Sequence, residues 1–426
     1  MVMEDERMDA EGEQKLETEV APALIAVHPD QKFVSACVRS DLRVFNVGDG
    51  CKVTLVDANG GHKDSIRAIR YSKCGGLFVS AGDDKLVKIW DTDSWRCALS
   101  VVSEKRVTSV AISIDGTFVC FADKFGVVYA VEIGDYNSEN PALAKKAVPI
   151  LAHYCSIITR LEFSPDGRYI VTADRDFKIR VTQFPAKPLD GAHEIQSFCL
   201  GHTEFVSCIV FLSCRDNTQG FLVSGSGDST VRLWEYVSGS LLDTCEVGTK
   251  AELLNSSEAH DEILPAVTDL CATSGSLIAV AIQNLPGIML LNCDSSSRTL
   301  SIAKVVRVEE EAYIPTSLAA SSSVPFLWMI MGASSSNCST PVARVRIASD
   351  FISGSNLLVL DDSKIPGGEP LLVALQGRLA IGEEAFSTAA EAVKTSMRNL
   401  MIKKQYSAER REVRKKGRND KKNQIS

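Results

Sequence analysis

Short runs of alternating apolar and polar residues fill most of the chain, and this alternation predicts strands that bury one face. The clearest runs lie at 81–91 (AGDDKLVKIWD), 173–183 (ADRDFKIRVTQ) and 225–235 (GSGDSTVRLWE). In each run an aspartate stands six residues before a tryptophan or before the residue in its place. These pairs are Asp84 and Trp90, Asp176 and Thr182, and Asp228 and Trp234.

A glycine–histidine pair precedes two of these runs. Gly61-His62 and Gly201-His202 each stand about 30 residues before the tryptophan of their run, and the unit recurs at a period of about 40–45 residues. This pattern resembles the WD repeat, in which four strands form one blade of a propeller. The histidine then hydrogen-bonds through a serine or threonine to the tryptophan and satisfies a buried aspartate. The residues expected in these structural roles are His62, Asp84, Trp90, Asp176, His202, Asp228 and Trp234.

Weaker copies extend the repeat in both directions. Residues 24–46 and 106–132 fit two further blades, the second with a hairpin turn at 113–116. Short β-like runs between serine-rich loops at 246–385 favour two more, so we expect seven blades in a closed ring that exposes no long sheet edge. The expected fold is all-β, with the propeller over 21–385, a disordered acidic segment over 1–20 and a basic helix with a disordered tail over 386–426.

Composition indicates an intracellular, globular protein. Of the 426 residues, 45% are hydrophobic and 23% are charged, as in ordinary globular chains. The 13 cysteines are irregularly spaced and include no CxxC pair, so neither a disulfide scaffold nor a zinc site is expected. The sequence lacks both a signal-peptide core and an apolar run of the roughly 18 residues that a membrane helix needs. We therefore expect the nucleus, with the cytoplasm as a second compartment, and no membrane contact.

Charge is unevenly distributed between the two ends. Residues 1–19 carry eight acidic and two basic side chains, whereas residues 398–422 carry eleven basic and three acidic ones. The basic tail fits an RNA-binding arm that gains affinity by counterion release, an import signal, or a solubilising end. The bases expected to bind RNA are Lys403, Lys404, Arg410, Arg411, Arg414, Lys415 and Lys416.

The sequence lacks the common motifs of catalysis. It contains no HExxH, no GxSxG and no P-loop. The glycine-rich segment 225–230 resembles a phosphate loop, but it lacks the lysine and lies in a turn between strands. We expect no catalytic residue, no metal and no cofactor bound by this chain.

A cluster of charge distinguishes the run at 173–183 from its neighbours. Lys178 and Arg180 alternate with apolar residues and so share one strand face, and Thr182 replaces the usual tryptophan. One interpretation is a solvated strand face; the other is a docking site whose bases pair with carboxylates or phosphates. The candidate docking residues are Asp174, Arg175, Lys178 and Arg180, while Asp176 is expected in the structural turn role.

Residues 169–236 resemble a particular WD-repeat family. The runs YIVTADRDFKIRV, IQSFCLGHTEFVS and SGSGDSTVRLWEY are similar to the WD-repeat, non-catalytic subunit of eukaryotic tRNA (guanine-N7-)-methyltransferase. The resemblance implies a propeller that does no chemistry and binds a separate catalytic chain. That partner binds S-adenosylmethionine and methylates a guanine in the tRNA variable loop. The resemblance also implies that the basic tail helps to hold tRNA.

Within that family, the strand that carries ADRDxKIRV lies at the interface with the catalytic chain. Its last base pairs with an acidic residue of the partner, and here that base is Arg180, with Lys178 and Arg175 in support. Two rival functions stay open. One is a scaffold of another kind, such as a ubiquitin-ligase substrate receptor or a ribosome-assembly factor. The other is a propeller enzyme, which needs convergent carboxylates or metal ligands in the central channel.

Overall fold

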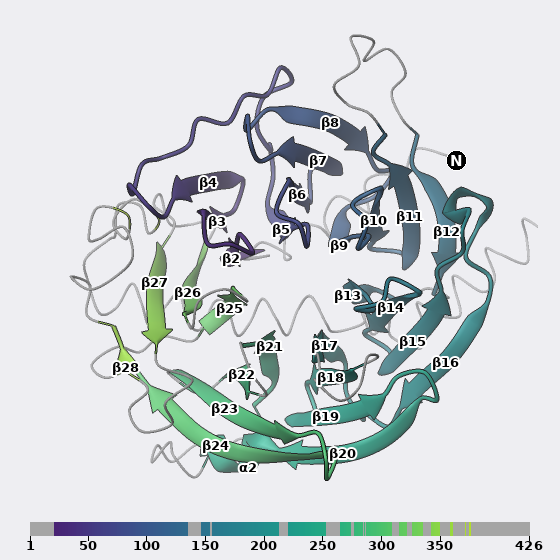
Figure 1. Cartoon of the computed structure of the whole chain (residues 1–426), viewed down its shortest axis with the longest axis vertical. Helices are drawn as coiled ribbons and strands as arrows, with labels where there is room; N and C mark the ends of the chain where they lie inside the picture. Colours follow the sequence, from purple (N-terminus) through teal and green to yellow (C-terminus); the bar gives the residue numbers. More distant parts are fainter. Residues whose placement is uncertain are drawn as a thin grey trace, which may run out of the picture.

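The chain folds into a closed ring of seven antiparallel sheets, a seven-bladed β-propeller (Figure 1). The computed structural model describes residues 21–134, 146–153, 156–212, 220–252, 265–273, 277–283, 285, 287–308, 315–321, 326–334, 342–349, 358–360, 371 and 375. The predicted all-β class and the predicted seven blades are both confirmed. The predicted segments at 1–20 and 386–426 lie outside the described residues.

The first four blades occupy the N-terminal half of the ring. Blade 1 consists of β2 (Leu24–Val27), β3 (Phe33–Val38) and β4 (Asp41–Asn46). Blade 2 consists of β5 (Ile66–Tyr71), β6 (Leu77–Gly82), β7 (Leu86–Asp91) and β8 (Cys97–Val102). Blade 3 consists of β9 (Val107–Ile112), β10 (Phe118–Asp123), β11 (Val127–Glu132) and β12 (Val148–Ala152). Blade 4 consists of β13 (Ile158–Phe163), β14 (Tyr169–Asp174), β15 (Lys178–Gln183) and β16 (Ile195–Leu200), with the short helix η1 (Pro188–Asp190) before β16.

The remaining three blades complete the ring. Blade 5 consists of β17 (Val206–Leu212), β18 (Phe221–Ser226), β19 (Thr230–Glu235) and β20 (Ser240–Glu246), followed by helix α2 (Val247–Glu252). Blade 6 consists of β21 (Val267–Ala272), β22 (Leu277–Ile282), β23 (Gly287–Asp294) and β24 (Thr299–Arg307). Blade 7 consists of β25 (Pro315–Ala320), β26 (Leu327–Ser334), β27 (Val342–Ser349) and β28 (Leu358–Val359).

The first and last blades meet at the ring closure. The two-residue strand β1 (Ala21–Pro22) pairs with the end of β26, and the chain then continues directly into β2. Thr316 in β25 also donates a hydrogen bond to the carbonyl oxygen of Ala23, at 2.8 Å. The N-terminal strands thus join the two ends of the ring, and the apolar faces of blades 1 and 7 cover each other there.

The hydrophobic core lies between adjacent blades, because each blade is too thin to bury both of its faces alone. One cluster joins Val171 and Val181 of blade 4 to Leu222 and Trp234 of blade 5. A second joins Ile170 of blade 4 to residues of blade 3. The alternation in each strand therefore places one set of apolar residues against each neighbouring blade.

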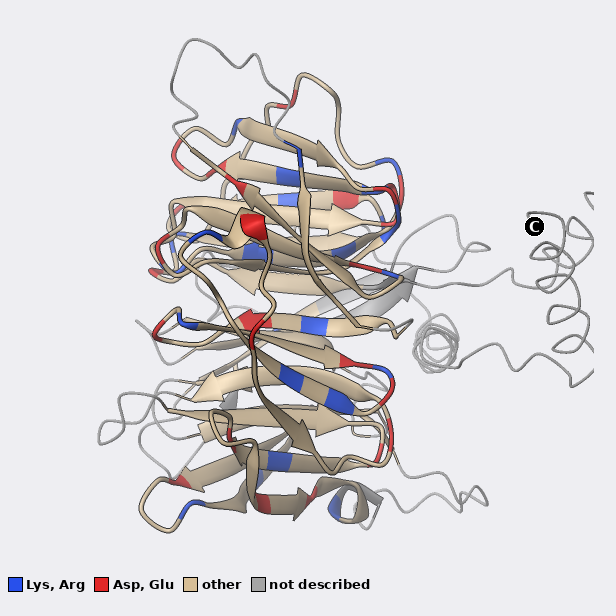
Figure 2. Ribbon diagram, turned by 90° about the vertical axis from the view of Figure 1, so that its right-hand side faces the viewer, with Lys and Arg blue, Asp and Glu red and all other residues tan. Residues whose placement is uncertain are grey.

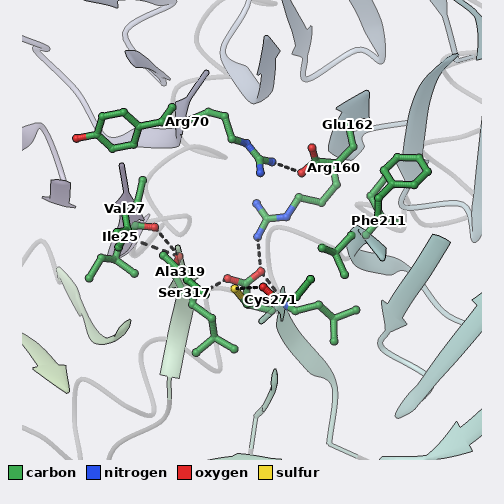
Figure 3. Close-up of a pocket in the computed structure, with 18 of the residues that line it drawn as sticks. Ile25, Val27, Arg70, Arg160, Glu162, Phe211, Cys271, Ser317 and Ala319 are labelled. Atoms are coloured by element: carbon green, nitrogen blue, oxygen red, sulfur yellow. Dashed lines mark hydrogen bonds and ion pairs between the residues drawn. The ribbon is translucent and has the colours of Figure 1, made fainter. Parts of the chain in front are cut away.

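A cavity of about 980 Å³ occupies the centre of the ring, lined by the first strand of each blade (Figure 3). Four charged side chains cross it between blades that are not neighbours in the ring. Arg70 of blade 2 pairs with Glu162 of blade 4, and Arg160 of blade 4 pairs with Asp269 of blade 6 at 3.1 Å. Burial raises the pKa of Glu162, and the two arginines offset only part of that effect.

These channel residues form a cross-brace between blades. The second carboxylate oxygen of Asp269 accepts a hydrogen bond from the backbone N–H of Leu318 in blade 7, at 2.8 Å. Each described charge of the brace therefore has an opposite charge beside it, which is the condition for burying charge at tolerable cost. The carboxylates are occupied by arginines within the fold and are not displayed as a converging catalytic set.

The described part of the chain contains no helix that is both long enough and apolar enough to cross a membrane.

Candidate partner-docking face on blade 4

The residues that match the WD pattern form hydrogen-bonded networks in blades 2 and 5. In blade 5, His202 Nδ1 lies 2.8 Å from Asp228, and His202 Nε2 lies 2.7 Å from Ser224 Oγ. Trp234 Nε1 donates to the same hydroxyl at 2.8 Å. Blade 2 repeats this arrangement with His62, Asp84, Ser80 and Trp90. All of these groups are turned into the fold and serve the blade.

The glycine before each histidine has a steric reason in blade 5. Gly201 has a φ of +155°, and a Cβ on it would lie 2.5 Å from Arg232 Nη1. That atom is the end of a flexible side chain and can move, so the backbone is the stronger constraint, because a φ in this region is strained for a residue with a Cβ. A Cβ on Gly61 in blade 2 would meet nothing within 4 Å, so the requirement is seen in blade 5 and not in blade 2.

Blade 4 corrects one sequence-based assignment. The spacing to Thr182 predicts Asp176 as the structural aspartate, but His153 Nδ1 lies 2.8 Å from Asp174 instead. His153 Nε2 lies 2.7 Å from Thr172 Oγ1, which takes the place of the serine in the other blades. In blade 4 the histidine partner predicted to be Asp176 is thus Asp174, two residues earlier, at the end of β14 and not in the turn that follows it. Asp174 is buried and is therefore not displayed to a partner.

The histidine–aspartate pairs make folding stability depend on pH. Burial alone would raise the pKa of Asp228, but bonds from His202, Thr230 and Thr203 outweigh burial and lower it. The pKa values of Asp84 and Asp174 are lowered for the same reason. A carboxyl whose folded pKa is depressed stabilises the fold above its unfolded pKa, about 3.9, and that stability is lost as pH falls.

We expect the free energy of unfolding to fall as pH drops from about 5 to 3, because the unfolded chain takes up protons on these carboxylates before the folded chain does. Burial also lowers the pKa of His153, so protonation of the unfolded state already reduces stability somewhat as pH falls through about 6.5. Urea unfolding at a series of pH values measures both effects. An unfolding free energy that stays constant between pH 7 and 3 would contradict this role for the pairs.

Three basic residues occupy equivalent positions in three blades, and their side chains bind different groups. Lys88, Arg180 and Arg232 each lie opposite the serine or threonine that the blade histidine contacts. Lys88 is fully buried and binds Asp57 at 2.5 Å and the carbonyl oxygen of Gly60 at 2.9 Å. Arg232 Nε donates to Thr230 at 3.2 Å, and its Nη2 lies 3.8 Å from Asp228. Both bases are thus paired with a carboxylate of the fold.

Arg180 differs, because it has no carboxylate within ion-pairing distance among the described residues. Its Nη1 donates to the carbonyl oxygen of Ala152 in β12 at 3.1 Å, and its Nε is buried with no acceptor in the described structure. Burial lowers the pKa of Arg180, and the charge of Asp174 offsets only part of this effect. A charged, half-buried guanidinium with unused donors is costly unless an acceptor arrives from outside.

The two supporting bases differ in accessibility. Lys178 is exposed, and Arg175 is half-buried, like Arg180, in the turn between β14 and β15. Lys178 and Arg180 share one face of β15, and Arg175 lies in the turn that precedes this strand. Figure 2 views the molecule from the side on which β12, β15 and β16 lie in Figure 1, and its ribbon marks Lys and Arg positions on the strands as well as in the loops.

An apolar stripe beside these bases escaped the sequence reasoning. Lys178, Arg180 and Thr182 pair across the ladder with Leu200, Phe198 and Ile195 of β16. The three apolar side chains are 59%, 43% and 47% exposed, in that order. A bulge between Val181 and Thr182 puts Ile195 on the same face as the other two. Simple alternation assigns 195 and 198 to opposite faces, so the sequence pattern concealed the stripe.

The described residues can also be compared with the requirements of a metal site and of a reactive cysteine. They contain no group of three or more His, Cys, Asp and Glu side chains that could hold a metal ion. Burial raises the pKa of Cys199 and Cys208 to about 12, so these thiols stay protonated and unreactive. The predicted tail bases, from Lys403 to Lys416, lie outside the described residues.

The fold and its networks define a WD-repeat β-propeller, and residues 51–91 match the family model described as "WD domain, G-beta repeat". Residues 135–325 match a narrower family model, "tRNA methyltransferase TRM82 WD40 domain". That stretch, which includes all of blade 4, is thus similar to the TRM82 WD40 domain, and the resemblance drawn from the sequence is confirmed.

Curated relatives agree with this family. The chain is 30% identical over 247 residues to "tRNA (guanine-N(7)-)-methyltransferase non-catalytic subunit wdr4" of Dictyostelium discoideum, covering 55% of this chain and 51% of that protein. It is 37% identical over 191 residues to the Homo sapiens subunit of the same description, covering 45% and 42%. The Danio rerio subunit is 30% identical over 287 residues, covering 66% and 65%. The chain thus spans about half the length of the first two of these relatives.

Solved propellers share the fold at lower identity. The structure titled "Structure of U3-55K" has a TM-score of 0.57 and 19% identity, and covers 74% of this chain and 91% of that chain. The structure titled "Crystal structure of RRP9 WD40 repeats" has a TM-score of 0.57 and 18% identity, with coverage of 74% and 90%. At these identities the likeness concerns the fold alone.

Proposed function

We propose that this chain is the non-catalytic subunit of a tRNA (guanine-N7-)-methyltransferase and that the Arg180 face of blade 4 docks the catalytic subunit. The identity of the complex is supported by the family match over residues 135–325 and by the names of the relatives. The docking site is supported by one observation above all. Arg180 is a half-buried base without a carboxylate in the described structure, at a position where Lys88 and Arg232 are both paired.

A rigid propeller face suits the task of stabilising another chain. Arg180 lies on β15, between two other strands of its blade, so its position is fixed by the ladder and not by a loop. A preorganised base loses little conformational entropy when a carboxylate pairs with it. The catalytic subunit supplies S-adenosylmethionine binding and the chemistry, and this chain supplies a fixed surface that holds it in an active form.

A methyl-transfer assay on tRNA tests the proposal. It compares this chain alone, the catalytic chain from the same organism alone, and an equimolar mixture. We expect no transfer by this chain alone and at least about tenfold more transfer by the mixture than by the catalytic chain alone, a difference of roughly 1.4 kcal/mol in effective stabilisation. Equal activity of the catalytic chain with and without the propeller would contradict the proposal.

The basic tail is proposed to help hold tRNA through its phosphates. We expect deletion of residues 398–426 to weaken tRNA binding by the heterodimer and to flatten its salt dependence, because each phosphate contact contributes about −0.9 to the slope of log K against log salt for duplexes. Filter binding of the full and truncated heterodimers at several salt concentrations measures the slope. Co-purification of the truncated chain with the catalytic subunit is the control, and an unchanged slope would exclude the tail as an RNA arm. A nuclear location, which the same bases suggest as an import signal, stays a prediction.

A further inference from the structure

We propose that the apolar stripe Ile195–Phe198–Leu200 of β16 (the rim stripe) receives one segment of the catalytic subunit, in which apolar side chains flank a carboxylate. The carboxylate pairs with Arg180, and the apolar side chains cover the stripe. This inference rests on the proposed function, because it concerns the same face of blade 4. It adds the chemistry of the partner segment and assigns most of the affinity to residues that carry no charge.

The first argument is a comparison of equivalent positions on the outer strands. In blade 2 the three third-strand residues Leu86, Lys88 and Trp90 pair with Val102, Ser100 and Cys97. In blade 5 the residues Thr230, Arg232 and Trp234 pair with Glu246, Thr244 and Leu241. In both blades the residue opposite the base is a small hydroxyl residue, whereas blade 4 has Phe198 there. The repeat itself therefore does not require a large apolar stripe.

The second argument is exposure. Nine large hydrophobic side chains of the described chain are strongly exposed, and three of them are the rim stripe. Clustered apolar exposure beside unused hydrogen-bond donors is typical of a protein interface, whose buried centre is apolar and whose charges fix the register. Exposed apolar residues scattered singly carry no such meaning.

The third argument is that two buried polar groups on this face lack hydrogen-bond partners. Thr182 replaces the blade tryptophan, and its hydroxyl is buried with no hydrogen-bond partner in the described structure, as is Arg180 Nε. In blades 2 and 5 the corresponding tryptophan donates to the serine of the network. Blade 4 thus gives up a stabilising contact and keeps two poorly satisfied groups on the face that carries the stripe. Sites that violate the local rules of a fold are expected to be functional.

The apolar character of the stripe favours a protein segment over RNA as the partner of this face. An RNA backbone could supply acceptors to Arg180, but it would leave Ile195 and Leu200 in water, because aliphatic side chains offer no stacking surface to bases. A protein segment satisfies both requirements at once. A second copy of this chain is disfavoured. In a twofold dimer through this face the other copy would present its own stripe and Arg180, and it would supply no carboxylate to pair with Arg180.

The test measures binding of the catalytic subunit by full-length variants of this chain. Phe198→Ser and Leu200→Ser remove partly exposed side chains, so the variants are expected to fold and to keep their thermal midpoint. Each is expected to raise the Kd of the heterodimer about ten- to a hundredfold, the range for burying one such side chain. Leu241→Ser, at the blade 5 position that matches Ile195, is the control and should bind as the unchanged chain does.

Salt separates the stripe from the charge. The loss caused by Phe198→Ser should persist at about 0.5 M salt, whereas the loss caused by Arg180→Gln should shrink there because screening weakens the ion pair. If both serine variants bind normally while Arg180→Gln binds poorly, the stripe proposal is overturned and the docking proposal stands. If Arg180→Gln also binds normally, the docking proposal falls with it.

Two further measurements test whether RNA or a second copy of this chain covers the rim stripe instead. Loss of tRNA affinity by the Leu200→Ser chain alone, with normal binding of the catalytic subunit, would assign the stripe to RNA and overturn the proposal. A change from dimer to monomer in sedimentation of the same variant, again with normal heterodimer formation, would assign it to self-association and overturn the proposal as well.

Discussion

Arg180→Glu is expected to abolish the heterodimer while leaving the propeller folded. The substitution replaces the unpaired base by a charge of the same sign as the partner's carboxylate. Breaking a desolvated, hydrogen-bonded charge pair costs about 2–5 kcal/mol, and the reversed charge adds repulsion. The Kd should therefore rise by at least about a hundredfold, and the two chains should separate on a size-exclusion column at micromolar concentration.

The fold should tolerate the change because Arg180 contributes little to it. The only hydrogen bond of its side chain in the described structure goes to the carbonyl oxygen of Ala152, and its buried Nε has no acceptor there. A circular dichroism melt tests this, with a midpoint within a few degrees of the unchanged chain. Arg180→Gln and Arg232→Gln form a matched pair at equivalent positions of blades 4 and 5. Only the first should weaken the heterodimer, and co-purification of Arg180→Glu with an active methyltransferase at normal yield would disprove docking at this face.

Trp234→Ala is expected to produce the largest loss of folding stability among single substitutions in blade 5. Trp234 is fully buried between blades 4 and 5, and its Nε1 donates to Ser224 at 2.8 Å. Truncation of a buried tryptophan typically costs about 3–5 kcal/mol, because it removes apolar contacts and leaves a cavity. Urea unfolding of the purified chain measures the loss.

A milder pair of substitutions separates the hydrogen bond from the packing. Trp234→Phe keeps a ring but removes the donor to Ser224, so it should cost about 1 kcal/mol more than Trp95→Phe. Trp95 is also buried, but its Nε1 has no acceptor in the described structure, and its ring packs on Phe33 and Phe78. Equal costs at the two positions would show that the network around His202 contributes nothing beyond packing.

The repeat was predictable because its chemistry is local in sequence. Each strand needs alternation, each turn needs its aspartate, and the Gly-His pair recurs at a fixed distance from the tryptophan. These requirements hold separately in every blade, so a weak copy such as blade 1 can be found by comparison with strong copies. The number of blades could be predicted because the chain has room for a limited number of repeat copies and the ring has to close. No single blade carries this information.

Assignments failed where the repeat itself departs from its pattern. The spacing assigned the structural role to Asp176, but in blade 4 the histidine pairs with Asp174, two residues earlier. The channel brace of Arg70, Glu162, Arg160 and Asp269 joins blades 2, 4 and 6. The two residues of each ion pair are far apart in sequence, so no local pattern could reveal the brace.

By itself, the sequence determined the class of fold and the blade residues, and it drew attention to Arg175, Lys178 and Arg180 as excess charge. Only the tertiary structure decided that Arg180 lacks the carboxylate that Lys88 has, because pairing depends on neighbours such as Asp57 beside Lys88 and Ala152 beside Arg180. It also decided that Ile195, Phe198 and Leu200 share one face, since a single bulge reverses the alternation. Periodicity is a property of the chain, whereas a vacant hydrogen-bond donor and an exposed stripe are properties of how separate strands meet.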